Sequence, residues 1–259
     1  MLIDTHSHLF LEEFSKDLPQ VMERARQAGV SSIFMPNIDS TTIKPMLSVC
    51  ADYPDFCFPM IGLHPTSVNE SYGEELAVVH KYLSAPNNFI AIGEIGLDLY
   101  WDKTFLKEQL LVFEKQIKWA LEYDLPIVIH ARDAYEYIYK VMEPYKDTVL
   151  RGVFHSFTGT LEEAEKCLEF EKFMLGINGV VTFKKSLLAG ILSSSVPLER
   201  LVLETDSPYL TPVPNRGKRN ESANIKDTLF KVAEIYQVSP ERVSQVTSEN
   251  ALKVFGFSK

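Results

Sequence analysis

The chain opens with a short alternating segment whose polar residues have the types and spacing to bind a cation. Asp4, His6 and His8 lie two residues apart, so in an extended strand their side chains point to one face. Two imidazoles whose Cα atoms are about 6–7 Å apart can converge on a single ion. An H-x-H pair on its own is more often two half-buried histidines bonded to the backbone, so the prediction of metal binding depends on further ligands.

Further ligand types stand where other expected strands end. Glu94 follows an apolar run, and Asp206 ends another run just before Pro208. His130 and His155 each close a further apolar run. A charge or imidazole buried at such a position is costly unless it is paired or coordinates a metal. Together these residues form the ligand set of a two-metal hydrolytic site, which we expect at His6, His8, Glu94, His130, His155 and Asp206.

The expected cofactors are two divalent metal ions, Mg²⁺, Mn²⁺ or Zn²⁺. Some binuclear barrel hydrolases bridge their metals with a carbamylated lysine, but no lysine stands at an expected strand end, so Glu94 is the expected bridge. One metal would bind His6, His8 and Asp206, and the other would bind His130 and His155. Water between two such cations loses a proton near neutral pH. Asp206 is expected to orient that nucleophile and accept its proton.

Substrate contacts are expected from basic side chains near the same strand ends. His64 is expected to bond a phosphate oxygen or to protonate the leaving group, which would make it catalytic. Arg132 is expected to clamp phosphate with its planar fork, although a salt bridge with Asp133 or Glu136 fits the sequence equally well.

A basic run follows the last expected strand and contains Arg216, Lys218 and Arg219. TIM barrels favour phosphate sites in the loops after strands seven and eight, so we expect phosphate contacts here, with a solvated loop as the alternative. Asp4 and Glu204 are expected to support the metal ligands from behind.

Composition limits the function further. The 259 residues carry a formal net charge of -9, which argues against a protein that coats duplex DNA but not against a nuclease whose metals supply local positive charge. Three cysteines without CxxC spacing make a disulfide framework or thiolate zinc site unexpected. Asp4 and His6 interrupt the first apolar run, and no membrane span is expected. We expect a cytoplasmic monomer without an obligate protein partner.

Short apolar runs alternate with longer amphipathic segments along the chain. Strands are expected at 2–6, 32–36, 57–63, 89–93, 127–130, 152–155, 173–177 and 201–205. Helices are expected at 18–28, 42–51, 74–83, 105–123, 134–142, 161–170 and 187–193, with a terminal helix from Ser239 to Gly256. This alternation favours an α/β fold, a TIM (β/α)8 barrel with a parallel eight-stranded core and an extra C-terminal helix, as one domain over 1–259. A doubly wound sheet is the alternative, but no glycine-rich phosphate motif follows the first strand.

Several segments together resemble the TatD-type metal-dependent deoxyribonucleases. They lie at 4–9, 62–65, 92–98, 130–134, 152–159, 204–210, 216–221 and 247–251. The resemblance covers nearly the whole chain and implies a TIM-barrel hydrolase of the amidohydrolase-like superfamily. It implies metal ligands at the same six residues, and activity as a DNase, often a 3′–5′ exonuclease, assisted by Mg²⁺ or other divalent metals. The sequence departs from the family pattern at four positions, none of which is an expected metal ligand: Thr66, Ser156, Thr158 and Ser222.

The expected reaction is hydrolysis of DNA phosphodiester bonds. A basic loop in an otherwise acidic protein can bind the end of a strand but not a long duplex. We therefore expect a preference for single-stranded or frayed ends, and we expect salt to inhibit the activity. Equal activity on a closed circle would contradict this expectation. The alternatives are an amidohydrolase of a small cyclic amide or ester, and a non-catalytic metal-binding protein. Charge reversal at the basic run would distinguish the amidohydrolase, and the intact ligand set argues against the non-catalytic protein.

Overall fold

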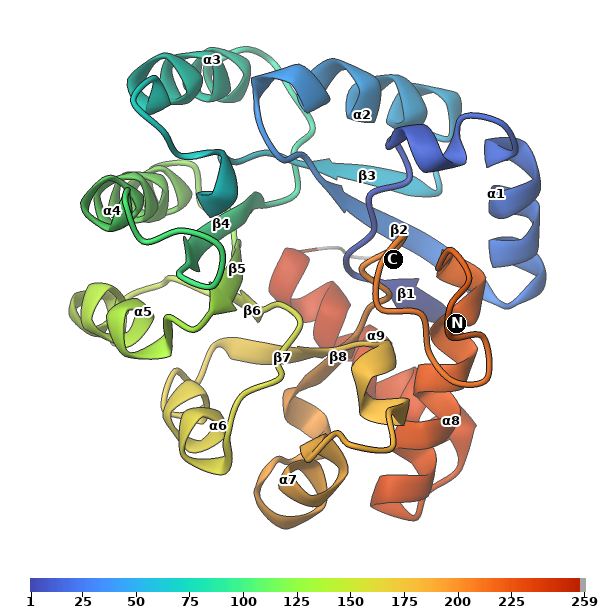
Figure 1. The fold of residues 1–259 in the computed structure, drawn as a ribbon. Helices are drawn as coiled ribbons and strands as arrows, with labels where there is room; N and C mark the ends of the chain where they lie inside the picture. The colour runs from blue at the N-terminus through green and yellow to red at the C-terminus, as the bar shows by residue number, and fades with distance from the viewer. Residues whose placement is uncertain (257–259) are drawn as a thin grey trace.

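The computed structural model describes residues 1–256, in which eight strands alternate with helices (Figure 1). The strands are β1 Leu2–Asp4, β2 Val30–Pro36, β3 Cys57–Met60, β4 Ile92–Asp98, β5 Ile127–Arg132, β6 Gly152–Phe154, β7 Phe173–Ile177 and β8 Leu201–Leu203. All of the described strand pairs are parallel. The predicted parallel α/β class is therefore confirmed.

The strands pair in two sheets, with the orders β1-β2-β3 and β4-β5-β6-β7-β8. Isolated parallel bridges link the sheets at both edges, between Ile61 and Ile92 and between Ser7 and Ser207. The two sheets lie around a common centre with helices outside them (Figure 1). The pairing thus gives sheets of three and five strands, where one continuous eight-stranded ladder was predicted, because contact at the two junctions is reduced to these bridges.

The described α-helices cover the outside of the sheets. They are α1 Leu18–Gln27, α2 Ser40–Asp52, α3 Tyr72–Ser84, α4 Leu106–Glu122, α5 Tyr135–Met142, α6 Leu161–Leu168, α7 Leu188–Ser195, α8 Ile225–Tyr236 and α9 Pro240–Phe255. Helix α8 is missing from the elements expected above, although its buried residues Ile225, Leu229, Val232 and Ala233 repeat at helical spacing. Within residues 1–256, no helix is long and apolar enough to span a lipid bilayer.

Several helix ends carry the capping residues that their sequence favours. Gly29 follows α1 with a φ of 86°, a conformation that glycine adopts without steric cost. Thr160 and Glu163 form the reciprocal capping box at the start of α6. The Ser239 side chain accepts from the N–H of Arg242 at the start of α9, and Gly256 closes that helix with a φ of 74°.

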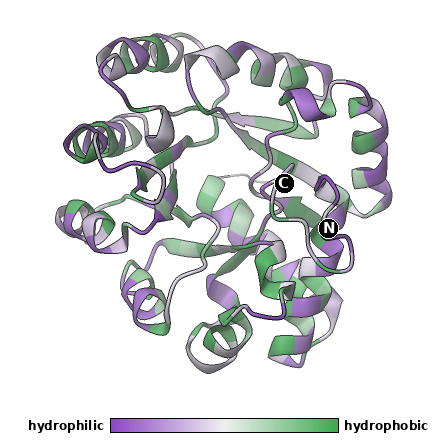
Figure 2. Cartoon of the chain, in the orientation of Figure 1, coloured by the Kyte–Doolittle hydropathy of each residue, from purple (hydrophilic) through white to green (hydrophobic). Residues whose placement is uncertain are grey.

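A layer of buried apolar side chains fills the space between the strands. It takes one residue from each strand or its immediate approach, namely Ile3, Phe34, Met60, Ala91, Val128, Val153, Met174 and Val202. Helix α9 packs on this layer through Ala251, Val254 and Phe255, and the rings of Phe34 and Phe255 lie 4.7 Å apart. The strands are correspondingly hydrophobic, whereas the outer helices carry both kinds of residue (Figure 2). The extra C-terminal helix therefore completes the core.

The fourth strand lies further along the chain than predicted. It spans Ile92–Asp98, where 89–93 was expected, so Glu94 lies within the strand and not after it. The cause is close packing against β5: a Cβ on Gly93 would meet Val128 Cβ at 2.7 Å, and one on Gly96 would meet the His130 carbonyl oxygen at 2.1 Å. The glycines look like strand breakers in the sequence, but here they allow two strands to approach.

Strands β1, β3, β6 and β8 also end earlier than predicted. As a result His6 and His155 lie after their strands and not within them, while His64 and Asp206 lie further beyond theirs. His64 directly precedes a short 3-10 turn, Pro65–Ser67. The predicted absence of disulfides is confirmed for the three cysteines, which are buried and free.

Replacement of two glycines by alanine should change the stability in opposite directions. Gly96→Ala puts a Cβ onto the β5 backbone at a φ of 138°, and we expect the free energy of unfolding to fall by about 2–4 kcal/mol. Gly190→Ala adds a Cβ in open space on helix α7, and we expect a gain of about 0.5–1 kcal/mol. Urea unfolding followed by circular dichroism measures both. Equal effects of the two changes would refute the packing role of Gly96.

Candidate metal centre

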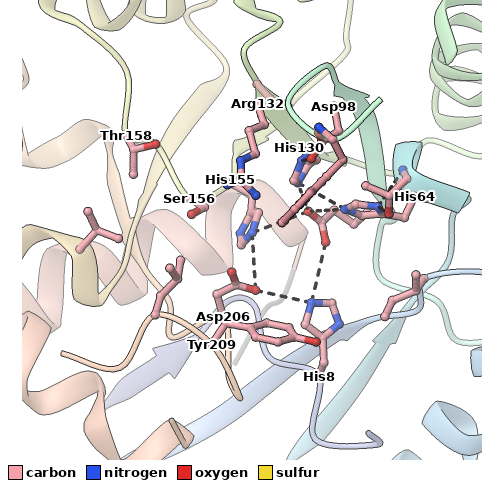
Figure 3. A pocket seen from close by; sticks show the side chains of 17 residues that line it. His8, His64, Asp98, His130, Arg132, His155, Ser156, Thr158, Asp206 and Tyr209 are labelled. Atoms are coloured by element: carbon pink, nitrogen blue, oxygen red, sulfur yellow. Dashed lines mark hydrogen bonds and ion pairs between the residues drawn. The ribbon is translucent and has the colours of Figure 1, made fainter. Parts of the chain in front are cut away.

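The six predicted ligands come together at the carboxyl ends of the strands. His6 and His8 follow β1, Glu94 lies in β4, His130 in β5, His155 directly after β6 and Asp206 after β8. A cavity of about 600 Å³ opens above them, and five of the six residues line it (Figure 3). His6 is fully buried beneath this cavity.

Glu94 lies at the middle of the cluster. Its Oε2 is 3.1 Å from Nε2 of His6 and 3.8 Å from Nε2 of His8. Its Oε1 faces three further imidazole nitrogens, those of His130 at 2.8 Å, His64 at 3.4 Å and His155 at 3.7 Å. The two carboxylate oxygens thus face two different groups of nitrogens, which is the arrangement that a bridging ligand requires.

The first group consists of His6, His8 and Asp206. The Nε2 atoms of the two histidines are 3.2 Å apart, and Asp206 Oδ1 lies 3.5 Å from that of His8 and 3.9 Å from that of His6. Ligand atoms that share one ion at about 2.1 Å lie roughly 3.0–3.6 Å apart. Nδ1 of His8 lies 3.2 Å from the Pro36 carbonyl oxygen, to which it can only donate, so Nε2 presents its lone pair to the group. These donors fit a divalent cation.

His64 was predicted to contact the substrate phosphate, and it lies within the cluster of predicted metal ligands. Its Nε2 is 3.3 Å from Nδ1 of His130 and 3.4 Å from Glu94. Its Nδ1 accepts the backbone N–H of Thr66 at 3.1 Å, so the neutral ring carries its proton on Nε2. Burial lowers the pKa of His64, which keeps the ring neutral. His64 therefore offers an N–H donor to the cavity, although its position would also suit a metal ligand.

His130 is held between two carboxylates. Its Nδ1 lies 2.8 Å from Glu94, and its Nε2 lies 2.8 Å from Asp98 Oδ2. Asp98 is not among the residues predicted for the site, although it lies four residues after Glu94 on the same strand. A carboxylate behind an imidazole fixes the ring and raises its basicity. Asp98 is thus the functional candidate that the sequence reasoning missed.

His155 lies between the two groups, where the prediction placed it with His130 alone. Its Nε2 is 3.7 Å from Glu94 and 3.8 Å from Asp206, and its ring stacks on His6 with centroids 3.4 Å apart. Its Nδ1 lies 3.0 Å from Oε1 of Glu204, a buried carboxylate that also accepts the N–H of Ser156 at 2.6 Å. This geometry fits the supporting role expected of Glu204.

Asp4 supports the cluster through the backbone. Its carboxylate accepts the N–H and the hydroxyl of Thr205 at 2.9 and 2.7 Å, and the N–H of His6 at 3.4 Å. Burial raises the pKa of Asp4 to about 7 against these hydrogen bonds. Asp4 thereby ties β1 to the segment that carries Asp206.

The three predicted phosphate-binding residues of the basic run differ in whether an acidic side chain already pairs with them. Arg219 is engaged within the protein: its two terminal guanidinium nitrogens donate to Asp17 at 2.8 Å, and its guanidinium lies over the ring of Phe14. Arg216 stacks on Phe183 at 3.9 Å, and Lys218 forms no ion pair within residues 1–256. A charge-reversal test of this loop should therefore use Arg216 and Lys218, since reversing Arg219 would break a structural ion pair.

Arg132 lines the cavity and is among its labelled residues (Figure 3). Its guanidinium lies 3.8 Å from the centre of the Tyr100 ring. The alternative salt bridge with Asp133 or Glu136 does not form in the described part of the chain. Arg132 thus remains available to a ligand in the cavity.

A parallel α/β fold with histidines and carboxylates gathered at its strand ends defines a metal-dependent hydrolase. The model of the TatD related DNase family matches residues 3–256, and the chain belongs to this family. It is 39% identical to an uncharacterized metal-dependent hydrolase, YabD, of Bacillus subtilis, with 98% of this chain and 99% of that protein covered.

Two further comparisons agree with this assignment. The chain is 32% identical to a 3′–5′ ssDNA/RNA exonuclease TatD of Yersinia pseudotuberculosis, over 98% of this chain and 99% of that protein. The crystal structure of YJJV, a TatD homolog from Escherichia coli, matches with a TM-score of 0.91 at 27% identity and covers 99% of this chain and 98% of that one.

The stability of the metal-free protein should fall as the pH rises. Burial lowers the pKa of His155 and of His130, but Glu204, Glu94 and Asp206 raise that of His155 to about 10, and Asp98 and Glu94 raise that of His130 to about 9. Both values exceed 6.5, the ordinary histidine pKa, so the protonated rings stabilise the fold fully below that pH. This contribution is lost as the pH rises through 9 and 10.

Cation binding must displace these protons, so the stabilisation by Mn²⁺ should grow with pH. We expect the Tm in EDTA to fall between pH 6.5 and 10 while the increment from added Mn²⁺ increases. Differential scanning fluorimetry measures both, with His80→Gln on helix α3 as the control. A pH-independent increment would mean that these histidines do not bind the metal.

Asp98→Asn should weaken metal binding. The amide keeps a hydrogen-bonding group beside Nε2 of His130 but removes the charge that raises its basicity, so we expect affinity to fall by about 10–100-fold. Competition with a chelating dye measures the affinity. Asp102→Asn changes an exposed carboxylate of the following loop and serves as the matched control. Unchanged affinity in Asp98→Asn would exclude the supporting role.

Proposed function

We propose that this protein is a metal-dependent 3′–5′ exodeoxyribonuclease that acts on single-stranded or frayed DNA ends. The observation that carries the proposal is the position of Glu94, whose two oxygens face two groups of imidazole nitrogens in one cavity. The relative from Yersinia pseudotuberculosis is named a 3′–5′ ssDNA/RNA exonuclease, which supports the same polarity and substrate.

The donor set fits two divalent ions. His6, His8 and Asp206 would hold one ion, and His130 and His155 the other, with Glu94 shared between them. When bound, two divalent cations neutralise phosphate charge and acidify water. The cluster suits two cations because Glu94 is buried yet ionised. Burial raises the pKa of Glu94, but the histidines that face it hold that pKa well below its ordinary value.

Asp206 is the proposed general base. Burial raises the pKa of this carboxyl, but His155, His8 and His6 hold it below its ordinary value, so it is ionised at neutral pH. Its Oδ1 faces the histidine nitrogens at the floor of the cavity (Figure 3). It is therefore placed to orient an attacking water and to accept its proton.

His64 is the proposed donor to the substrate. Thr66 holds its Nδ1, which leaves the Nε2–H directed toward Glu94 and His130 at the edge of the cavity. From there it can bond a phosphate oxygen or a leaving oxygen. Arg132, which lines the same cavity, adds a planar cation for phosphate.

We infer a single catalytic domain in which the two sheets act together as one TIM (β/α)8 barrel. The apolar layer drawn from all eight strand segments supports this reading, as do the bridges at both sheet junctions. We also propose a cytoplasmic monomer without an obligate protein partner. The three buried free cysteines are consistent with a reducing compartment.

End-labelled oligonucleotides test the proposed activity. Metal-stripped protein is supplied with Mg²⁺, Mn²⁺ or Zn²⁺ and given 3′-labelled strands, 5′-labelled strands or a closed single-stranded circle. We expect the 3′ label to leave first as a mononucleotide, the 5′ label to shorten progressively, and the circle to resist. Asp206→Asn should lower kcat by about 10²–10⁴-fold.

Asp52→Asn, at an exposed carboxylate that ends helix α2, is the control variant and should retain full activity. Cleavage of the circle at the linear rate would refute the requirement for an end. Wild-type turnover by Asp206→Asn would remove that residue from its proposed role.

A further inference from the structure

The loop after β4 presents two large aromatic rings to solvent, and one of them, that of Trp101, lines the cavity. Trp101 is 71% exposed and lines the cavity together with the metal-ligand candidates, and neighbouring Tyr100 is 54% exposed. Their ring centroids lie 4.9 Å apart. Exposed indole and phenol rings gathered beside a cavity mark a binding surface, because keeping them in water is unfavourable.

This loop is fixed by the residue that also supports the metal centre. Oδ1 of Asp98 accepts the backbone N–H groups of Tyr100 and Trp101 at 3.1 and 3.4 Å, while its Oδ2 lies 2.8 Å from His130. One carboxylate thus holds the aromatic rings at a set position relative to the metal-ligand candidates. The rings are placed to act on the same ligand as those residues.

Arg132 joins the two aromatic rings. Its guanidinium lies 3.8 Å from the centre of the Tyr100 ring and 5.3 Å from that of Trp101. Tyr209 lies across the histidine cluster from Arg132 (Figure 3). The rings of Tyr100 and Trp101 stand at 87° to each other, so the cavity side offers the indole of Trp101 and the guanidinium of Arg132, with Tyr100 packed against that guanidinium. The reacting phosphate would lie between this side and Tyr209.

We propose that Trp101, with Tyr100 and Arg132, forms a stacking platform for the nucleobase beside the scissile phosphate. The proposal rests on the exonuclease function proposed above. A planar nucleobase can stack on the face of the Trp101 indole, and the guanidinium of Arg132 attracts the adjoining phosphate. Every base has a π-face, so the platform gives little sequence preference. It requires an unpaired base and thereby selects single-stranded ends.

Intrinsic fluorescence tests the platform without relying on catalysis. The chain has two tryptophans, and Trp119, on helix α4, is only 6% exposed and stacks on His80. Trp119→Phe therefore leaves Trp101 as the sole indole. With Mg²⁺ present, thymidine 5′-phosphate should quench this emission far more than deoxyribose 5-phosphate does. Equal quenching by the two ligands, or none, would overturn the proposal.

Steady-state kinetics supply the second test. Trp101→Leu should raise KM for a single-stranded oligonucleotide by about 5- to 150-fold, the range that base–aromatic stacking supplies, with kcat little changed. Trp101→Phe should retain most of the affinity. On oligonucleotides with an abasic residue at the terminal or penultimate position, wild type and Trp101→Leu should have the same KM.

Phe230→Leu is the matched control, because Phe230 is 51% exposed on helix α8 and does not line the cavity. An unchanged KM in Trp101→Leu on intact strands would overturn the proposal. If the wild type cleaves no oligonucleotide, the proposed function fails, and the fluorescence titration still decides whether the platform binds a base.

Discussion

The structure depends on the burial of one ionised carboxylate. Glu94 is buried among imidazole rings, where desolvation alone would neutralise it. It stays charged because nitrogens from separate strand ends face both of its oxygens. Burying a charge in this way is favourable only with partners in place. The fold must therefore hold His130 of β5 and the histidines that follow β1 and β6 within a few ångströms of one residue of β4. The same arrangement makes the cluster suitable for divalent cations.

Backbone packing sets those distances more than side-chain contacts do. Gly93 and Gly96 let β4 approach β5 more closely than any side chain would permit, which brings Glu94 and His130 to 2.8 Å. On the other side, Asp4 bonds Thr205 and thereby aligns the segments that carry His6 and Asp206. Below the cluster, helix α9 packs on the apolar layer of the strands. Each of these contacts lies outside the set of predicted ligands, yet it fixes where those side chains point.

The parallel architecture and the candidate ligands were predictable, because apolar runs that end in histidine or carboxylate bring those residues to one edge of a parallel sheet. The position of β4 was not, since the packing of Gly96 against the His130 backbone is a tertiary contact that no local pattern reveals. The pairing of Arg219 with Asp17, 202 residues away, was equally hidden, because no local pattern shows which distant partner a basic residue meets. Helix α8 and Asp98 are different, because the sequence does contain a signal for each. The apolar residues of α8 repeat at helical spacing, and Asp98 lies an even number of residues after Glu94 on the same strand.

The net charge of -9 explains why recognition should be local. Long-range attraction cannot draw nucleic acid to an acidic protein, so affinity has to come from groups that act within contact distance. The cluster around Glu94, the fork of Arg132 and the exposed face of Trp101 are such groups, and they adjoin one cavity. Stacking on an indole does not depend on net charge, whereas phosphate contacts do. An acidic hydrolase that combines both can hold a few unpaired nucleotides at a strand end without binding the duplex behind them.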